Sequence, residues 1–480
     1  MEELQMDLIQ VIGRILPILA IALAAGVVVM GITYSVYIAY RKRGGKRSIT
    51  NRQFIASFLI LGWFVIVMTL TTFSRGANYE GWINLELFSG YINAWNQWSL
   101  SEFQLIIFNM LMFAPFGFIL PHIGMKTRHF KPVLLISLLV TLGIEILQMS
   151  TGRGIFELDD ILHNTLGSMA GYLLMRAILD SVEQRKITLR SLWKALCIPL
   201  VFTMLFSSAF IIYHNKELGN LSIRPAISQN MNQVEVTLNT RLPDEAEKVS
   251  LYRSSEIHNL EYAKRVASLM KDYFELHQKG SISIDGYNRI WSFLDNTGTE
   301  YTFSYDVSRG TWWLASNIEA STPVEPEDLI KQGQEYGSWL IENDLLPKKA
   351  IFSTQNGDTV RWDIEKTVTD IAKGDRDYDT GLVMIVPSTE PMIPQNLLYS
   401  MNKNIYVRVV DIISPAEAYE EIPKGNFSIY NNLKKGDKLS VNKYELTYTY
   451  DSKGYYQPVY RFEGEINGEN WDALIPAVMN

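Results

Sequence analysis

The chain has 480 residues and a formal net charge of −7. This average hides two chemically different halves: residues 1–213 carry a net charge of +5 and every long apolar run, whereas residues 214–480 carry −12. The apolar runs exclude a wholly soluble enzyme, and the single cysteine excludes a disulfide scaffold. Because no basic patch interleaved with aromatic residues is present, we expect no nucleic-acid partner.

The first half predicts a polytopic α-helical membrane protein, because each crossing of a bilayer takes roughly 17–25 apolar residues. The chain offers six transmembrane helices, at 15–38, 54–73, 104–121, 132–149, 160–179 and 195–213. The first is not a signal peptide, because acidic residues precede it and a basic run follows it. We therefore predict a first helix with a basic loop (1–53), a second membrane region (54–213) and a C-terminal region (214–480).

Basic residues indicate how the helices are oriented. Of the 17 Lys and Arg residues in 1–213, 14 fall in the segments 41–52, 126–131 and 176–194. The positive-inside rule makes these segments cytoplasmic, so the N-terminus and the whole C-terminal region are extracytoplasmic. Cys197 lies inside the sixth predicted helix, and an exported domain without cysteine favours the plasma membrane of a Gram-positive bacterium.

Polar residues within the predicted helices gather at one depth. Helical rise from the outer helix ends puts Asn109, Glu145 and Asn164 about 6–8 Å below the outer surface. With their neighbours, they form a predicted polar layer of Arg75, Asn109, Glu145, Gln148, Arg153, Asp159, Asp160 and Asn164. Ionisable residues inside a membrane are costly and indicate a binding site, but each of these residues could instead join helices or cap a helix end.

Small residues beside this layer predict close helix packing. Gly167 and Gly171 share the face of the fifth predicted helix that carries Asn164, which lets a neighbouring helix approach. Pro115 and Gly117 predict a kink in the third helix at the level of the layer.

Several motifs fall in order between about residues 69 and 176. They are Arg75, then Asn84, Leu85 and Phe88, then NMLMFAPFGFILP (109–121), IEILQ (144–148) and GRGIFELDDILHNTLGSMAGY (152–172). In this order they resemble the VanZ-like membrane family, of the teicoplanin-resistance protein type. The resemblance implies a role in lowered susceptibility to glycopeptide antibiotics, and its polar positions are largely those of the predicted layer.

Residues 214–480 alternate between polar and apolar side chains, as strands do. Two similar runs, 300–310 and 445–454, predict β-hairpins whose partner strands lie at 312–315 and 457–463. Helical patterns at 257–278 and 326–345 complete an α+β domain, which we divide into the units 231–320 and 321–480. Its C-terminal end weakly resembles extracytoplasmic modules of the PepSY and YycI types.

The C-terminal region shows no catalytic motif, and we expect no cofactor and no metal. His258 and His277 lack a ligand spacing, which favours surface or core histidines. The acidic run 375–379 lacks the Gly and Glu positions of a calcium loop, which favours a solvated turn.

These observations favour a non-enzymatic envelope protein whose polar layer contacts a lipid headgroup or a lipid-linked cell-wall precursor. Glu145 and Asp160 are its predicted charged centre, and the C-terminal domain binds an extracytoplasmic protein or ligand. The orienting amides are Asn109, Gln148 and Asn164, and the groups expected to hold phosphate or neutralise the acids are Arg75 and Arg153.

Two alternatives belong to other classes. In an intramembrane enzyme, Glu145 and Asp160 would share acid–base work on a lipid-linked substrate, or would hold a divalent ion with Asp159 and His163. In a sensor, the C-terminal domain would receive the signal and the helices would be its anchor.

Overall fold

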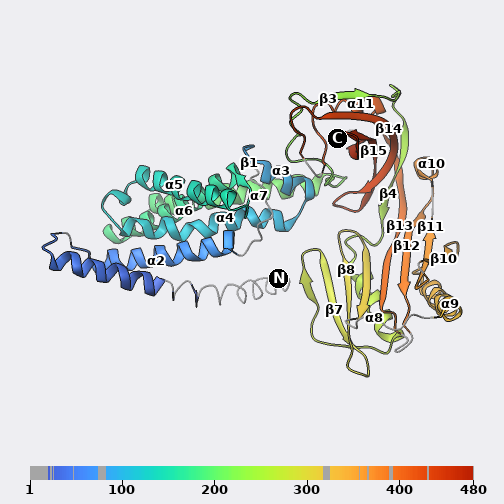
Figure 1. Cartoon of the computed structure of the whole chain (residues 1–480), viewed down its shortest axis with the longest axis horizontal. Coiled ribbons are helices and arrows are strands. Elements are labelled where there is room, and N and C mark those ends of the chain that lie inside the picture. Colours follow the sequence, from blue (N-terminus) through green and yellow to red (C-terminus); the bar gives the residue numbers. More distant parts are fainter. Residues whose placement is uncertain are drawn as a thin grey trace. The chain divides into compact units, whose positions relative to one another are not determined.

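The structure, a computed structural model, describes residues 20–21, 24, 26–46, 48–73, 83–316, 325–355, 357–364, 367–388, 393–429 and 432–478. The chain forms two compact units, Met1–Lys216 and Glu217–Asn480 (Figure 1). The first unit is helical, and the second is built on a β-sheet.

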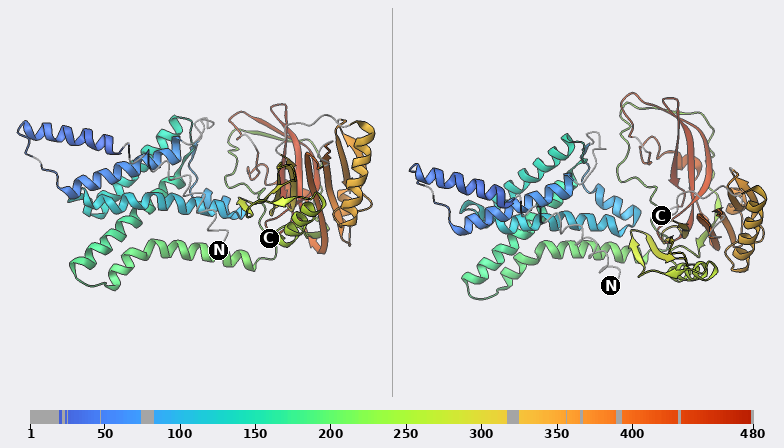
Figure 2. Two further views of the ribbon diagram at one scale, coloured as in Figure 1. Left: turned by 90° about the horizontal axis from the view of Figure 1, so that it is seen from below. Right: turned by 60° about the horizontal axis from the view of Figure 1, so that its bottom comes forward.

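Long helices that run side by side make up the N-terminal unit (Figure 2). An apolar helix covers residues 26–42. The elements after it are α2 (Asn51–Met68), the π-helix η1 (Thr69–Phe73), β1 (Ile83–Asn84), α3 (Ser89–Gln97), α4 (Leu100–Ile119), the 3₁₀ turns η2 (Leu120–His122) and η3 (Lys126–Arg128), α5 (Phe130–Ser150), β2 (Phe156–Glu157), α6 (Leu158–Glu183) and α7 (Leu189–Asn215). The two short strands pair in parallel and tie the loop before α3 to the start of α6.

Local signals fix where these helices begin. Thr50 and Gln53 form a capping box at the start of α2, in which each side chain bonds to the backbone N–H of the other residue. Thr188 caps α7 in a similar way, because its hydroxyl accepts a hydrogen bond from the N–H of Ser191. Pro115 lies inside α4, where it removes one backbone donor.

Among the described residues, four helical segments are long and apolar enough to cross a membrane: Asn51–Thr72, Leu100–His122, Phe130–Ser150 and Leu189–Asn215. They coincide with four of the six predicted spans and fit a membrane protein with a large C-terminal domain. The predicted span 15–38 lies partly outside the described residues. The predicted span 160–179 coincides with α6, which carries Asp159 and Asp160 in its first turn and buries much of its length in the bundle.

The α4 and α6 helices approach each other at three glycines. A Cβ added to Gly117 would lie 1.7 Å from the carbonyl oxygen of Ser168, and one added to Gly171 would lie 1.9 Å from that of Ala114. A Cβ on Gly167 would lie 2.0 Å from the carbonyl oxygen of Met110. No other residue type fits between these backbones, so α6 is held tightly against α4.

The described strands of the C-terminal unit form one 14-stranded sheet with the order β3-β14-β15-β4-β13-β9-β8-β7-β5. Beside this order, β12 pairs with β13, β11 with β12 and β10 with β11, while β6 pairs with β7 and β16 with β15. The strands are β3 (Glu235–Leu238), β4 (Lys248–Ser254), β5 (His277–Gln278), β6 (Ser283–Asp285), β7 (Asn288–Leu294), β8 (Glu300–Asp306), β9 (Thr311–Ser316), β10 (Ile351–Gln355), β11 (Thr359–Ile364), β12 (Tyr378–Val386), β13 (Asn396–Asp411), β14 (Lys438–Tyr450), β15 (Tyr455–Ile466) and β16 (Glu469–Pro476). The helices are α8 (Leu260–Tyr273), α9 (Pro326–Glu342), α10 (Val368–Ala372) and α11 (Pro415–Tyr419).

Both predicted hairpins are confirmed. The β8 and β9 strands pair antiparallel, with Phe303 opposite Leu314, and β14 and β15 pair with Tyr448 opposite Pro458. The predicted helical segments 257–278 and 326–345 contain α8 and α9.

Two hydrophobic cores lie along this sheet. The first gathers α8, α9, β7 to β9, β11, β12 and the first half of β13, so both predicted units contribute to it. The second gathers β4, β14 to β16, α10, α11 and Val410 near the end of β13. The long strand β13, which carries a bulge between Tyr406 and Arg408 where it pairs with β4, therefore takes part in both cores.

Candidate polar site in the membrane unit

The end of α2 is joined to the end of α5 and to the turn after it by side-chain to backbone hydrogen bonds. At this end α2 widens into the π-helix η1. The Nε2 of Gln148 donates to the carbonyl oxygen of Thr71 at 3.3 Å, and the Nη1 of Arg153 donates to that of Thr72 at 3.5 Å. Carbonyl groups at a helix end lack an intrahelical partner, and π-helical turns occur often at functional sites.

Glu145 lies beneath this turn. Its side chain is on α5, the residue is 1 % exposed, and its Oε2 accepts a hydrogen bond from the backbone N–H of Glu157 at 3.4 Å. Enclosing a carboxylate to this extent is costly unless partners or a ligand compensate for the lost hydration. Glu145 is therefore the most enclosed acid of the predicted polar layer.

A line of polar contacts continues from Glu145 between α5 and α6. The hydroxyl of Thr141 accepts from the Nδ2 of Asn164 at 3.1 Å, and the hydroxyls of Ser137 and Ser168 are 2.6 Å apart. The Oδ1 of Asn164 and the hydroxyl of Thr165 are buried without a hydrogen-bond partner in the part of the chain that the structure describes. Polar groups thus extend along the helix interface well beyond one level.

Asn109 and Asp160 form a separate pair between α4 and α6. The Nδ2 of Asn109 donates to the Oδ1 of Asp160 at 2.6 Å, and both residues are half-buried. An amide that donates to a carboxylate is a charge-assisted hydrogen bond and stronger than one between neutral groups. This pair fixes the first turn of α6 against α4.

Asp159 instead caps α3. Its Oδ1 accepts from the N–H of Phe88 at 2.6 Å, and its Oδ2 accepts from the N–H of Gly90 at 2.8 Å and from the hydroxyl of Ser89 at 3.3 Å. Phe88 has a φ of 69° and starts the helix without a side-chain cap of its own. A carboxylate from a distant part of the chain therefore satisfies the orphan donors of this helix end.

His163 also contacts α3. Its Nε2 is 2.8 Å from the hydroxyl of Tyr91, and the two rings meet edge to face. Among the described residues, no group of three or more His, Cys, Asp or Glu side chains is arranged to hold a metal ion. The suggested divalent site of Glu145, Asp160, Asp159 and His163 therefore does not form such a group, and the side chains of Asp159 and His163 bond to the start of α3 instead.

The structure distributes the predicted polar layer over several contacts. Gln148 and Arg153 bond to the end of α2, Glu145 bonds to the backbone at the start of α6, and we call these three residues the turn cluster. Asn109 pairs with Asp160. The remaining members are Asn164 in the α5–α6 interface, Asp159 at the cap of α3, and Arg75, which lies outside the described residues.

Sequence reasoning missed the hydroxyl groups that join this site. Ser137, Thr141 and Glu145 are spaced four residues apart, which puts them on one face of α5, and this spacing is the signal that could have found them. The carbonyl groups of Thr71 and Thr72 could not be found, because backbone acceptors depend on where a helix ends and not on residue type.

The histidines of the C-terminal unit have ordinary partners. The Nε2 of His258 is 2.9 Å from the carbonyl oxygen of Ser452, and the Nε2 of His277 is 3.3 Å from the Oδ1 of Asn296. In the acidic run, Asp377 accepts a hydrogen bond from the N–H of Tyr406 at 2.9 Å. These contacts join loops and strands of the sheet.

No curated protein matches the chain. Among solved structures, the C-terminal domain of Bacillus megaterium YpeB is similar at 12 % identity and a TM-score of 0.20, covering 46 % of this chain and 98 % of that one. An uncharacterized protein from Eubacterium rectale is similar at 12 % identity and a TM-score of 0.20, covering 51 % and 87 %. Residues 54–179 match the model of the VanZ/LLP1 family, which confirms the resemblance predicted from the motifs.

Proposed function

We propose that this protein is an envelope protein of a bacterium that lowers susceptibility to glycopeptide antibiotics of the teicoplanin type. In this proposal the turn cluster contacts the headgroup of an outer-leaflet lipid or of a lipid-linked cell-wall precursor. The observation that carries the proposal is the nearly complete enclosure of Glu145 near the end of α5, close in sequence to Gln148 on the same helix and Arg153 on the turn that follows. The match of residues 54–179 to the VanZ/LLP1 family supports the link to glycopeptides.

The chemistry of the cluster fits a headgroup that carries both phosphate and polar donors. A guanidinium such as that of Arg153 recognises phosphate through charge and planar N–H donors. Glu145 accepts hydrogen bonds from hydroxyl or amine groups, and Gln148 both donates and accepts. A precursor held this way would be less accessible to an antibiotic that binds it from outside.

The proposal includes a topology in which the chain crosses the membrane six times and the turn cluster lies at the outer surface. The basic segments support it, because they belong to the opposite end of the bundle. There Arg52 bonds to His122, and Tyr172 bonds to the carbonyl oxygen of Arg128. Arg176 and Lys194 both pair with Asp180 near the loop between α6 and α7.

The test is the substitution Glu145→Gln, which keeps size and removes the charge. Teicoplanin susceptibility is measured in cells that produce the full chain, with surface labelling to match protein levels. We expect Glu145→Gln to return susceptibility to that of cells without the protein. The matched control is Glu183→Gln, an exposed position at the far end of α6, which should behave like the parent.

Two results would contradict the proposal. One is a parent protein that leaves teicoplanin susceptibility unchanged. The other is a Glu145→Gln variant that protects as well as the parent at equal surface level.

A further inference from the structure

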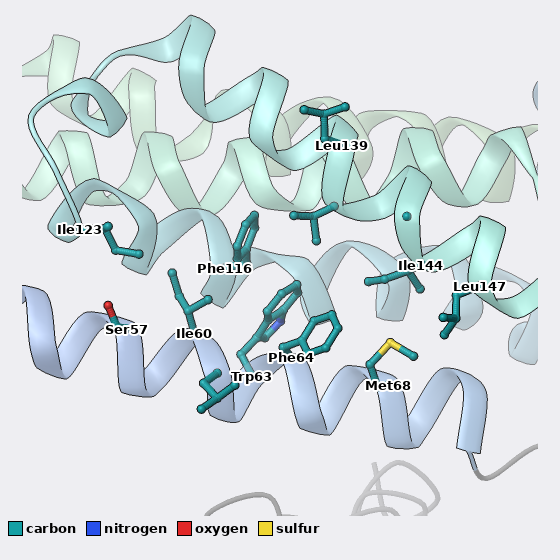
Figure 3. Close-up of a pocket in the computed structure, with 13 residues that line it drawn as sticks. Ser57, Ile60, Trp63, Phe64, Met68, Phe116, Ile123, Leu139, Ile144 and Leu147 are labelled. Atoms are coloured by element: carbon teal, nitrogen blue, oxygen red, sulfur yellow. The ribbon is translucent and has the colours of Figure 1, made fainter. Parts of the chain in front are cut away.

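An apolar groove of about 600 Å³ runs along α2 and α5 (Figure 3). Phe116 of α4 and Trp63 of α2 point into the space between the helices. Its lining includes Ser57, Phe64 and Met68 of α2 and Leu139, Gly143 and Leu147 of α5. Several of them are open to the surroundings: Phe64 is 42 % exposed and Leu139 is 58 % exposed.

The groove has the length of one bilayer leaflet. Ser57 and Met68 lie eleven residues apart on α2, which is about 16 Å at the rise of an α-helix. Half of the hydrocarbon core of a bilayer is about 15 Å. Both walls belong to helices that are apolar and long enough to cross a membrane, so the groove opens toward hydrocarbon.

One end of the groove is polar. Met68 and Leu147 are its last apolar residues at this end (Figure 3). One helical turn further along α2, the carbonyl oxygens of Thr71 and Thr72 accept the hydrogen bonds from Gln148 and Arg153. The apolar groove therefore leads to the guanidinium of Arg153. This arrangement suits a molecule with a hydrocarbon chain and an anionic head.

We propose that the groove holds one acyl chain of an anionic phospholipid, whose headgroup lies against Arg153 in the turn cluster. This inference rests on the proposed function, because it names the lipid class that the turn cluster contacts. An empty groove inside hydrocarbon would forfeit van der Waals contacts along its whole length. A linear chain fits because Gly143 lacks a side chain and leaves the middle of the groove open, with no atom within 4 Å of an added Cβ.

The experiment uses the full chain in nanodiscs of phosphatidylcholine with a trace of phosphatidylglycerol that carries a photoreactive group on one acyl chain. After illumination, peptides are mapped by mass spectrometry. We expect labelling on both walls of the groove, with loss of most of it in Gly143→Phe. The control Gly62→Phe places the same side chain on α2 outside the groove, where an added Cβ also meets no atom within 4 Å, and should keep the labelling.

If Gly143→Phe fails to elute as a folded protein, Leu139→Trp replaces it, because this exposed side chain also lines the groove. Absence of groove labelling in the parent, or equal labelling in parent and filled variants, would overturn the inference. Equal labelling by a photoreactive phosphatidylcholine would overturn the role of the anionic head. Displacement by polyprenyl phosphate, but not by phosphatidylglycerol, would overturn the choice of a phospholipid.

The labelling is independent of antibiotic susceptibility, so the two proposals fail separately. If the groove of the parent is not labelled but Glu145→Gln still abolishes protection against teicoplanin, only the lipid-binding proposal is contradicted. Labelling that follows the expected pattern beside an unchanged Glu145→Gln phenotype contradicts the proposed function alone.

Discussion

Two neighbouring acids in α6 illustrate what single residues contribute. Asp159 caps α3 through its carboxylate, whereas Asp160 accepts from the amide of Asn109 on α4. Their place in the first turn of a helix follows from the sequence, because a long helical segment is predicted to begin there. Their partners do not, because the direction of each side chain depends on how α6 is rotated against its neighbours.

Replacing Asp159 tests its role as a cap. The substitution Asp159→Ala leaves the N–H groups of Phe88 and Gly90 without their acceptor, which should destabilise the start of α3 by about 1–3 kcal/mol. Hydrogen exchange of residues 83–98 should become faster, with little change in α5. The comparison variant Asp160→Asn keeps the cap, so fast exchange of α3 in both variants would contradict this account.

At the scale of elements, the positions of the long helices follow from the hydropathy of the sequence, but the short elements between them do not. The predicted loop 74–103 contains α3, which is too short and too polar to stand out as a span. Its Trp98 stacks on Tyr213 of α7 with ring centroids 3.5 Å apart, a contact between segments far apart in the chain. Such partners cannot be read from one sequence.

The C-terminal sheet shows the same limit. The alternation of polar and apolar side chains predicted both hairpins, because their strands are close in sequence and joined by short turns. The sheet order was not accessible, because β13 pairs with β4, β9 and β12, and β15 pairs with β4 across a large separation in sequence. Which non-local strands meet depends on packing of whole layers.

The contact between α4 and α6 gives a prediction at the same scale. Gly171→Val inserts a branched side chain where the carbonyl oxygen of Ala114 lies 1.9 Å from an added Cβ. Overpacking of this kind costs about 1–3 kcal/mol or more, so the variant should unfold at lower temperature in detergent than the parent. Gly62→Val, where nothing lies within 4 Å, is the matched control. Equal melting of the two variants would show that the helices separate easily.

For the whole molecule, the division of charge separates two chemically distinct units. The membrane unit has a net positive charge, and most of this charge lies in segments at the end of the bundle away from the turn cluster. The C-terminal unit is strongly acidic and contains both cores of the sheet. Within the membrane unit, Arg153 therefore stands out as a basic residue at the polar end, and a headgroup contact should depend on it.

The most direct measurement of this claim is the lipid that the purified full chain retains from a membrane of mixed phosphatidylglycerol and phosphatidylcholine. We expect the parent to enrich phosphatidylglycerol and Arg153→Gln to lose the enrichment. We expect Arg185→Gln, which removes an exposed charge in the loop between α6 and α7, to keep the enrichment. Equal enrichment in the parent and Arg153→Gln would contradict the claim that the turn cluster contacts an anionic headgroup.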